Sequence, residues 1–542
     1  MHHCFRLSEI LEVIFQFVFD SVEVEPDRHY VLPGLLPSPC AQDRRSVLHL
    51  ALTCRAFYDP ALNVLYSHLR DIYHLIKSLP DQLVELILSR RPFPAEHFRS
   101  LVLCAARVQI LCAAHIQLLF DPCYNDTAYT FLLASVPKDA PLFPKLRSLA
   151  WHDERLASIQ VLTFLLPTVE TPSISISDIR FRKTIIPGLR TAAPRLKALE
   201  FEGITPWDYP SEIESLLLSY PEILAELSFL CCDISSSLLR AIALWPRLRW
   251  LSVQLGFKSI PTAPLHVSQS FQALAHLHIS CQDLNIFISF LCAFRMLGMD
   301  SDTFGCPNLN TIHINTNRCS PASSWSELLT VLTRTKLEHI IISERCHDHA
   351  QPCPAPSSFD FYPLLAHPTA LADLKTLVLS PGHSSSIALT GADIITLARA
   401  WSCLNILDLG LRNTPVSLYA LGILVRRCRE LREVSLCVNV GLDALGATPL
   451  NDDDNQLGSQ PNMRLIKLDV GESPIACAGP LHPLTAPDLM RSIPRFLHAM
   501  APRLEGISRT ACIVWFQGIY GRRWETVSDA LFAMANEVEH GD

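Results

Sequence analysis

The stretch Leu309-Asn310-Thr311-Ile312-His313-Ile314 has apolar residues at its first, fourth and sixth positions. The same Leu-x-x-Leu-x-Leu spacing, with small variations, recurs along most of the 542-residue chain, and each copy is followed by a segment of helical pattern. The best copies begin at Leu146, Leu196, Leu224, Leu248, Leu274, Leu309, Leu337, Leu374, Leu404, Leu431 and Leu465. Most intervals between neighbouring copies fall between 24 and 37 residues. Recurrence at this period predicts a stack of repeated structural units.

The alternation within each copy predicts a short strand whose apolar residues point inward while the intervening residues point outward. The inward sets include Leu248, Leu251 and Val253; Leu309, Ile312 and Ile314; Leu337, Ile340 and Ile342; Leu374, Leu377 and Leu379; and Leu404, Leu407 and Leu409. Cys232, Asn317 and Asn439 stand three residues after the last inward position, where this kind of repeat uses a side chain to hold the turning backbone.

Apolar residues at helical spacing lie between the strands, in the segments 237–244, 284–294, 325–332, 392–400 and 418–425. Strands and helices that alternate at this period indicate an α/β leucine-rich-repeat solenoid. We expect parallel strands on the concave face and helices outside, because helices are wider than strands.

Composition agrees with a folded repeat protein, since 49% of the residues are apolar and 18% are charged. The net charge of -8, with no dense Lys/Arg run, argues against nucleic acid as a partner. No uncharged apolar stretch is long enough to span a membrane, and the amino terminus lacks the pattern of a signal peptide. The odd count of 19 scattered cysteines favours free thiols, so we expect a cytoplasmic or nuclear protein.

The outward strand positions are where a repeat solenoid binds its partner. Through the middle of the array they carry aromatic and imidazole side chains, which are enriched at the centres of interfaces. The predicted target-binding residues are Trp250, His276, His278, His313 and His339. The alternative is a solvated strand face without a particular ligand.

The amino-terminal segment has a helical pattern with two apolar sides. Leu7, Ile10, Leu11, Ile14 and Val18 form one stripe, and Val13, Phe15, Phe17 and Phe19 make the other side apolar as well. An insertion over about residues 21–45 precedes a second helical stretch, 46–57. Asp59 then offers an N-cap, with Pro60 at the first position of a helix that carries Leu62, Leu65 and Leu69.

This segment resembles an F-box, the helical motif that binds the Skp-type adaptor of a cullin ubiquitin ligase. The matching stretches are Leu7-Ser8-Glu9-Ile10-Leu11, Leu50-Ala51-Leu52-Thr53-Cys54-Arg55-Ala56-Phe57, and the following residues up to Tyr66. Ser8 stands where the family usually has proline, and the insertion separates helices that are normally adjacent. The resemblance implies adaptor binding through Leu7, Ile10, Leu11, Ile14, Leu52, Cys54, Phe57, Leu62 and Leu65.

A narrower resemblance is to the divergent F-box and leucine-rich-repeat proteins that are common in mushroom-forming fungi. Three stretches occur in the order expected of that group: Arg90-Arg91-Pro92-Phe93-Pro94-Ala95-Glu96-His97-Phe98, Ala106-Arg107-Val108-Gln109-Ile110-Leu111 and Phe143-Pro144-Lys145-Leu146-Arg147-Ser148-Leu149. Together with the repeats, this resemblance covers most of the chain.

No motif of catalytic spacing is found, so we expect neither an enzyme nor a cofactor. Cys346-His347-Asp348-His349 with Cys353 comes closest to a metal site. Zinc sites usually take their ligands from separated elements, and this loop contains Pro352, Pro354 and Pro356, so we interpret it as a solvated loop without metal.

These patterns predict a small all-α F-box-like domain at 1–78, a helical connector and the start of the array at 79–140, the main solenoid at 141–510 and a C-terminal helical cap at 511–542. The expected function is that of a non-catalytic substrate receptor in a Skp/cullin/F-box ubiquitin ligase. Its partners would be the Skp-type adaptor, a cullin through that adaptor, and an unknown target protein. The alternative is a repeat scaffold without a ubiquitin role, in which the amino-terminal helices only cap the array.

Overall fold

The structure is a computed structural model, and it divides the chain into two compact units. Unit 1 comprises residues 1–234 and 245–248, and unit 2 comprises residues 235–244 and 249–542. The residues described are 8–20, 41–69, 75, 80, 85, 101–113, 141–151, 168–175, 188–189, 191, 194–202, 211–260, 270–294, 306–345, 357–367, 371–410, 412–440, 460–471, 473, 475, 487–504, 506–508 and 519–539.

Unit 1 begins with three helices and continues as a ladder of parallel strands. Its elements are α1 (Ser8–Asp20), α2 (Ala41–Thr53), α3 (Arg55–Ser67), β1 (His68–Leu69), β2 (Ile110–Ala113), β3 (Ser148–Trp151), β4 (Thr171–Ser175), β5 (Ala198–Glu202), α10 (Ser211–Leu217) and β6 (Glu226–Asp233). Strands β1 to β6 pair in chain order. The ladder therefore starts at β1, inside the range 1–78 that was predicted for the helical domain.

Unit 2 continues the alternation of strand and helix. Its first elements are α11 (Ser236–Ala243), β7 (Trp250–Leu255), η2 (Phe257–Ser259), β8 (His276–Cys281), α12 (Leu284–Ala293), β9 (Thr311–Thr316), α13 (Ala322–Leu332), β10 (His339–Glu344), β11 (Ser357–Asp360) and α14 (Tyr362–Ala366). The later ones are β12 (Thr376–Ser380), β13 (Ser385–Ala388), α15 (Gly391–Ala400), β14 (Ile406–Asp408), β15 (Val416–Ser417), α16 (Leu418–Arg427), β16 (Glu433–Ser435), β17 (Val438–Asn439), β18 (Lys467–Asp469), α18 (Pro487–Met500), β19 (Gly506–Ser508) and α19 (Ile519–Glu539).

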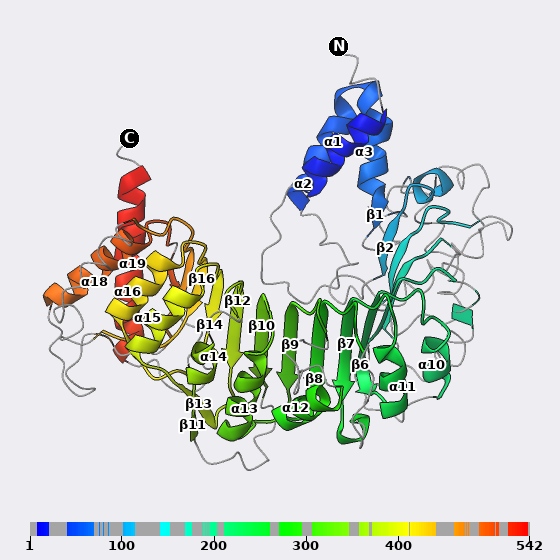
Figure 1. Cartoon of the computed structure of the whole chain (residues 1–542). Helices are drawn as coiled ribbons and strands as arrows, with labels where there is room; N and C mark the ends of the chain where they lie inside the picture. The colour runs from blue at the N-terminus through cyan, green and yellow to red at the C-terminus, as the bar shows by residue number, and fades with distance from the viewer. Residues whose placement is uncertain are drawn as a thin grey trace. The chain divides into compact units, whose positions relative to one another are not determined.

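The long strands of unit 2 form one parallel sheet in the order β7, β8, β9, β10, β12, β14, β16, β18, β19. Two further parallel sheets have two strands each, β11 with β13 and β15 with β17. In the sequence, β11, β13 and β15 each follow a strand of the large sheet and precede a helix. Figure 1 shows helices α12 to α16 following one another along the sheet. The chain is thus a mixed α/β protein with the architecture of a repeat solenoid.

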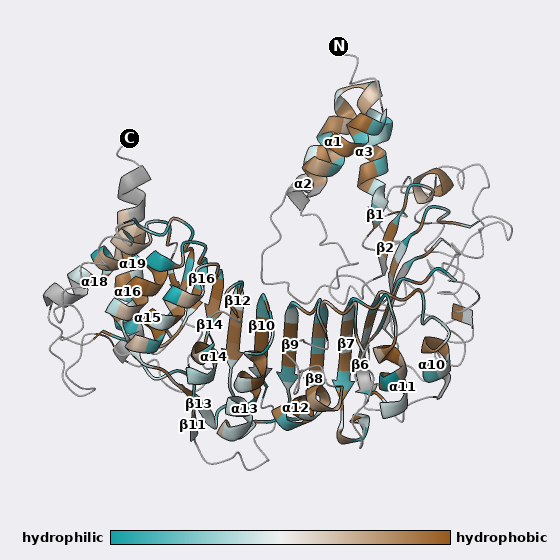
Figure 2. Cartoon of the chain, viewed as in Figure 1, coloured by the Kyte–Doolittle hydropathy of each residue, from teal (hydrophilic) through white to brown (hydrophobic). Residues whose placement is uncertain are grey.

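One buried residue from each strand forms a continuous row through unit 2, which we call the core row. It consists of Leu251, Leu277, Ile312, Ile340, Leu377, Leu407, Val434, Leu468 and Ile507, paired in that order. Every member is buried. Figure 2 shows that hydrophobic residues recur in the strands and in the helices beside them. The prediction that inward residues of successive copies line up as neighbouring parallel rungs is confirmed.

The helices of unit 2 begin where the sequence supplies a capping side chain. Ser235 Oγ accepts a hydrogen bond from the Leu238 backbone N–H at 3.1 Å, and Asp283 Oδ1 accepts one from the Asn285 backbone N–H at 2.9 Å. Thr390 and Asp393 bond to each other's backbone N–H groups and form a capping box at α15. Such caps satisfy N–H groups that have no partner within the helix.

Buried asparagines hold the backbone where the chain turns between elements. The Asn462 amide donates to the carbonyls of Val425 at 3.1 Å and Cys428 at 3.0 Å, and its Oδ1 accepts from the Arg464 N–H at 2.7 Å. Asn413 plays the same part beside Cys437. These are not the residues that the spacing singled out: Asn317 and Asn439 are exposed, and the Cys232 side chain lies outside the described residues.

At the far end of unit 2, α19 packs against α18 and β19. The Trp524 side chain is fully buried, and its indole N–H donates to the Ser473 carbonyl at 3.0 Å. These contacts cover part of the last rungs of the ladder, which would otherwise present apolar side chains to solvent.

Among the described helices, none combines the length and the apolar character needed to cross a membrane. The expectation of free thiols holds for Cys54, Cys104, Cys281, Cys292, Cys306, Cys403, Cys428 and Cys437. It is wrong for Cys319, which is disulfide-bonded.

We expect Leu407→Ala to lower the free energy of unfolding of unit 2 by about 2–5 kcal/mol, because it removes a fully buried side chain between two rungs. Urea unfolding followed by circular dichroism measures this change. Leu244→Ala is the matched control, since Leu244 is 56% exposed. Equal midpoints for the two variants would contradict the packing of the core row.

Candidate binding surfaces

Helices α1, α2 and α3 pack around a small apolar core. Its buried members are Leu11, Phe15, Phe19, Val47, Ala51, Ala61 and Val64. The rings of Phe15 and Phe57 meet edge to face, with centroids 5.4 Å apart. Core positions 11, 15 and 19 on α1 are four residues apart, which places them on one side of the helix.

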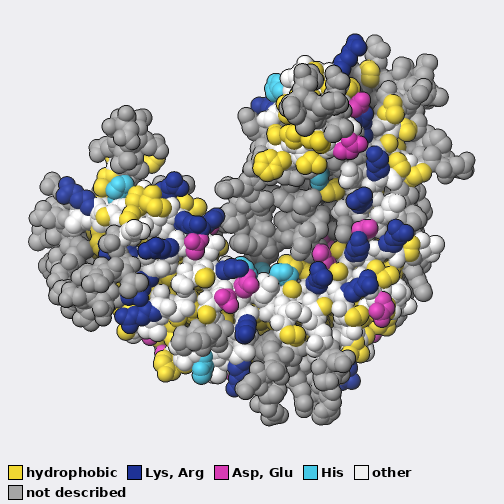
Figure 3. All heavy atoms as spheres, turned by 45° about the horizontal axis from the view of Figure 1, so that its top comes forward, with side chains coloured by type: hydrophobic (Ala, Val, Ile, Leu, Met, Phe, Trp, Pro, Cys, Tyr) yellow, Lys and Arg dark blue, Asp and Glu magenta, His cyan; other side chains and the backbone are white. Residues whose placement is uncertain are grey.

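The opposite side of α1 is also apolar, and it is exposed. Val13 is 70% exposed and Phe17 is 75% exposed. Ile10 and Ile14 are exposed on the same face of the helix. Leu48 and Leu52 on α2 and Tyr58 on α3 are exposed as well. We call these residues the apolar patch: Ile10, Val13, Ile14, Phe17, Leu48, Leu52 and Tyr58. Hydrophobic side chains gather over these helices in Figure 3. Clustered exposed apolar residues mark interaction surfaces.

The residues expected to bind the adaptor divide between the patch and the core. Ile10, Ile14 and Leu52 belong to the patch, whereas Leu11 is buried. Cys54, Phe57, Leu62 and Leu65 are partly buried, and Leu7 lies outside the described residues. The stripe read from the sequence therefore mixed two faces of α1. The predicted set did not include the patch residues Val13, Phe17, Leu48 and Tyr58, although Val13 and Phe17 lie three and seven residues after Ile10, a helical spacing.

Helix α3 differs at its start from the expected helix. It begins at Arg55 and contains Pro60, so Asp59 does not cap it. Pro60 is the sixth residue of α3 and has no backbone N–H, so the helix lacks one of its internal hydrogen bonds there. The Asp59 carbonyl instead accepts from Arg107 Nη1 at 3.0 Å, and its carboxylate pairs with Arg107 Nη2 at 2.8 Å. The second helix likewise begins at residue 41, inside the range expected for the insertion.

The patch is joined to the first strands of unit 1. Helix α3 runs directly into β1, and the Gln109 N–H donates to the Ser67 carbonyl at 2.9 Å. Arg107 Nη1 also donates to Asn63 Oδ1 at 2.6 Å, and the Asn63 amide donates to Glu12 Oε1 at 2.5 Å. A chain of polar contacts thus links α1 and α3 to the segment before β2.

In unit 2, the residues that alternate with the core row form a second face of the sheet, which we call the outward face. Trp250, His276, Thr311 and His339 are paired across β7, β8, β9 and β10. His278 and His313 are paired in the next row, and their rings stack with centroids 4.3 Å apart. The structure therefore brings all five predicted target-binding residues together on neighbouring strands.

A polar network crosses four strands of this face. The Ser343 hydroxyl donates to Asn315 Oδ1 at 2.5 Å, and Asn315 Nδ2 lies 3.0 Å from His278 Nε2. His278 Nδ1 lies 2.8 Å from Ser252 Oγ. Because an amide nitrogen donates, Nε2 of His278 accepts and Nδ1 carries the proton. Both ring nitrogens of His278 thus have hydrogen-bond partners within the chain. The rings of Trp250 and His276 lie against each other, with centroids 5.0 Å apart.

Burial keeps these imidazoles neutral. It lowers the pKa of His278 to about 3, with smaller contributions from His313 and Arg345. Burial also lowers the pKa of His276, against an opposing effect of Glu338. The centre of the outward face thus carries neutral aromatic and polar groups.

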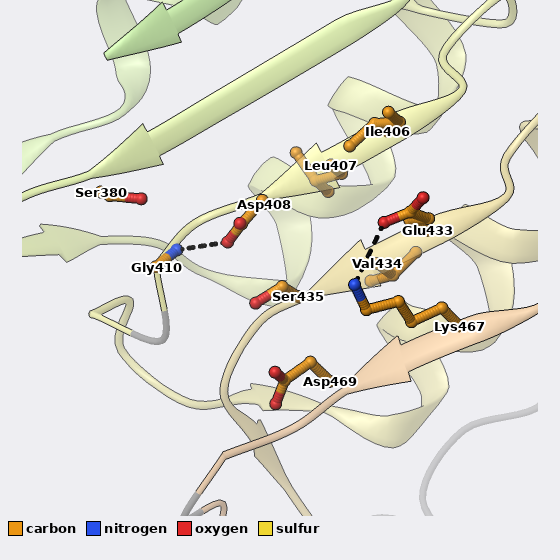
Figure 4. Close-up of a pocket in the computed structure, with 10 residues that line it drawn as sticks. All are labelled: Ser380, Ile406, Leu407, Asp408, Gly410, Glu433, Val434, Ser435, Lys467 and Asp469. Carbon is orange, nitrogen blue, oxygen red and sulfur yellow. Dashed lines mark hydrogen bonds and ion pairs between the residues drawn. The ribbon is translucent and has the colours of Figure 1, made fainter. Parts of the chain in front are cut away.

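A cavity of about 310 Å³ lies farther along the outward face, on strands β12, β14, β16 and β18. It is lined by Ser380, Ile406, Leu407, Asp408, Gly410, Glu433, Val434, Ser435, Lys467 and Asp469 (Figure 4). Asp408 Oδ1 accepts from the Gly410 N–H at 2.8 Å, and Lys467 Nζ lies 3.5 Å from Glu433 Oε2. No pattern in the sequence predicts this cavity.

The Cys346 to Cys353 loop lies outside the described residues. Within the part of the chain that is described, no group of three or more His, Cys, Asp or Glu side chains could hold a metal ion.

No protein-family model matches the chain, and a search of curated proteins finds no match. Among solved structures, the chain is similar to the crystal structure of the Rad7 and Elc1 complex in yeast. The sequence identity is 12%, the match covers 77% of this chain and 89% of that chain, and the TM-score is 0.29.

The polar network predicts a pH dependence of stability. In the unfolded state, the His278 side chain binds a proton when the pH falls below its ordinary pKa of about 6.5. In the folded state it does so only when the pH approaches 3. Folding is therefore weakened as the pH falls through 6.5. From pH 7 to pH 5 this one group costs roughly 2 kcal/mol.

The test compares urea unfolding of wild type and His278→Gln at pH 7 and at pH 5. Wild type should lose roughly 2 kcal/mol more than the variant over this interval. The same pH dependence in both proteins would show that His278 is protonated normally in the folded state.

Proposed function

We propose that this chain is a substrate receptor of a Skp/cullin/F-box ubiquitin ligase. Helices α1 to α3 would bind the Skp-type adaptor, and through it a cullin, while the outward face of the repeats would bind a target protein. With this role we place the chain in the cytoplasm or the nucleus. The observation that carries the proposal is the exposure of a second apolar face on α1.

The exposed face of α1 distinguishes between two roles for the helices, binding to an adaptor and covering the end of the repeat array. A helix that only caps a repeat array would bury its apolar residues within the chain. Phe17 and Val13 are instead exposed, on the side of α1 opposite Phe15. An exposed aromatic surrounded by aliphatic residues is suited to a protein interface, because it buries a large area when covered. This supports the receptor over the scaffold whose helices serve only as a cap.

Three residues of the apolar patch are also among those that the F-box resemblance implies for adaptor binding. Ile10 and Ile14 in α1 and Leu52 in α2 belong both to the apolar patch and to the residues implied by the motif. Leu11 and Phe57, which the motif also implies, pack the helices together. Their contribution to binding would be indirect, through the positions of α1 and α3.

The chain's part in ubiquitin transfer would be proximity rather than catalysis. A receptor raises the effective concentration of the target near the attached ligase, and such tethering alone accelerates a bimolecular step. The neutral ring surface of Trp250 and His276 is suited to holding a protein, since aromatic side chains bury area at low entropic cost.

We expect the double variant Phe17→Asp with Leu52→Asp to bind the Skp-type adaptor at least 10-fold more weakly than wild type. Each substitution places a charge where an apolar side chain would be buried, and a loss of about 1.4 kcal/mol already corresponds to 10-fold. Pull-down with purified adaptor, followed by titration, measures the effect.

Phe257→Asp is the matched control, because Phe257 is 66% exposed and lies in unit 2, outside the patch. Leu11→Asp is not suitable, since it would disrupt the helical core. Unchanged adaptor binding by a folded double variant would contradict the proposed docking surface.

A further inference from the structure

The cavity on strands β12 to β18 is bordered by three positions with little or no side chain. Gly410 has φ +60°, and a Cβ there would lie 2.9 Å from the Ser380 Cα. Only glycine fits this approach without strain. The neighbouring Ser380 and Ser435 side chains are short, so a hollow remains between the strands (Figure 4).

Two aspartates stand on either side of Ser435 in the same row of the sheet. Asp408 pairs with Ser435, and Ser435 pairs with Asp469. Rungs of a sheet lie about 4.8 Å apart, so the two aspartates are roughly 10 Å apart at their Cα atoms. A bound group between them could contact both carboxylates.

The carboxylates are fixed in place before anything binds. Asp408 Oδ1 accepts from the Gly410 N–H at 2.8 Å, and Asp469 Oδ1 accepts from the Gly471 N–H at 3.0 Å. The Ser508 hydroxyl donates to Asp469 Oδ2 at 3.2 Å. A hydrogen bond from the Ser435 side chain also helps to hold Asp408. Pre-organised acceptors bind a donor at lower entropic cost.

The cavity has an excess of negative charge. The charged groups that line it are Asp408, Glu433, Asp469 and Lys467, and the Lys467 ammonium faces Glu433 at 3.5 Å. Burial raises the pKa of Asp408, as expected of a carboxylate that loses solvation. Hydrogen bonds from Gly410 and Ser435 and the charge of Lys467 act in the opposite direction, and a further cation beside this carboxylate would restore more of the lost solvation. The lining therefore complements a cationic group.

Size and geometry select the kind of cation. At about 310 Å³ the cavity is at the lower limit of ligand sites, which suits one side chain rather than a cofactor. A metal ion is disfavoured because the described residues hold no cluster of three ligands. A guanidinium is planar and carries five N–H donors on two edges, so it can bridge carboxylates on different strands.

We propose that this cavity receives an arginine side chain of the protein that the repeats capture, bound between Asp408 and Asp469. This inference rests on the proposed function, because it assigns a chemical feature to the target of the receptor. The outward face of unit 2 would then carry two features for the target. One is the aromatic surface at Trp250 and His276, and the other is an acidic site on β14 to β18 for an arginine of the target.

Selection of peptides by the full-length chain tests this assignment. A displayed library of random peptides is panned on wild type and on the double variant Asp408→Asn with Asp469→Asn. Asn keeps the shape and the acceptor oxygen of Asp but removes the charge. Asp373→Asn is the control, since Asp373 is exposed and does not line the cavity.

Wild type and the control should enrich peptides that contain arginine, and the double variant should not. A selected peptide should bind the double variant at least 10-fold more weakly, and replacing its arginine by citrulline should cause a similar loss. Failure to enrich any peptide, enrichment without arginine, a preference for lysine, or binding that the double substitution leaves unchanged would overturn the proposal.

Adaptor binding, measured on the same proteins, separates the two proposals. The double variant should bind the Skp-type adaptor as wild type does. If wild type selects arginine peptides but binds no adaptor, the cavity assignment stands and the ligase role fails. If adaptor binding is normal and arginine is not selected, the cavity assignment alone is overturned.

Discussion

The parallel register of buried aliphatic residues on neighbouring strands is the constraint on which the rest of unit 2 depends. Members of the core row such as Leu377 and Leu407 are fully buried, and each lies between the rungs before and after it. A slip by one residue would move every apolar side chain to the opposite face. The same register therefore fixes which residues lie on the outward face, and it brings side chains that are distant in the sequence into one surface.

Two different surfaces result in the two units. In unit 1 the first strand continues from α3, so three helices are attached to the start of a ladder, with Phe17 and its neighbours exposed. In unit 2 the outward face combines neutral, mutually hydrogen-bonded groups around His278 with a charged cavity at Asp408 and Asp469. In the proposed receptor, the apolar patch of unit 1 would bind the ligase and the outward face of unit 2 would bind the target.

Sequence periodicity was sufficient to predict the repeat architecture, because buried strand and helix positions are set by spacing alone. It could not decide which apolar face of α1 is covered, since Leu11 and Ile10 are equally hydrophobic and only packing against α2 and α3 separates them. Strand β1 has two residues, too few for a periodic signal. The cavity was missed because it depends on Gly410 approaching a neighbouring strand, which requires the register between repeats.

Hydrogen–deuterium exchange of the full-length chain, with and without the Skp-type adaptor, tests the receptor role most directly. Exchange reports protection segment by segment, and a docked partner slows exchange where it covers the helices. We predict slower exchange over α1 and α2 when the adaptor is present, and no change over β7 to β10. Unchanged exchange in α1 at saturating adaptor, or protection confined to the outward face of unit 2, would contradict the proposed arrangement.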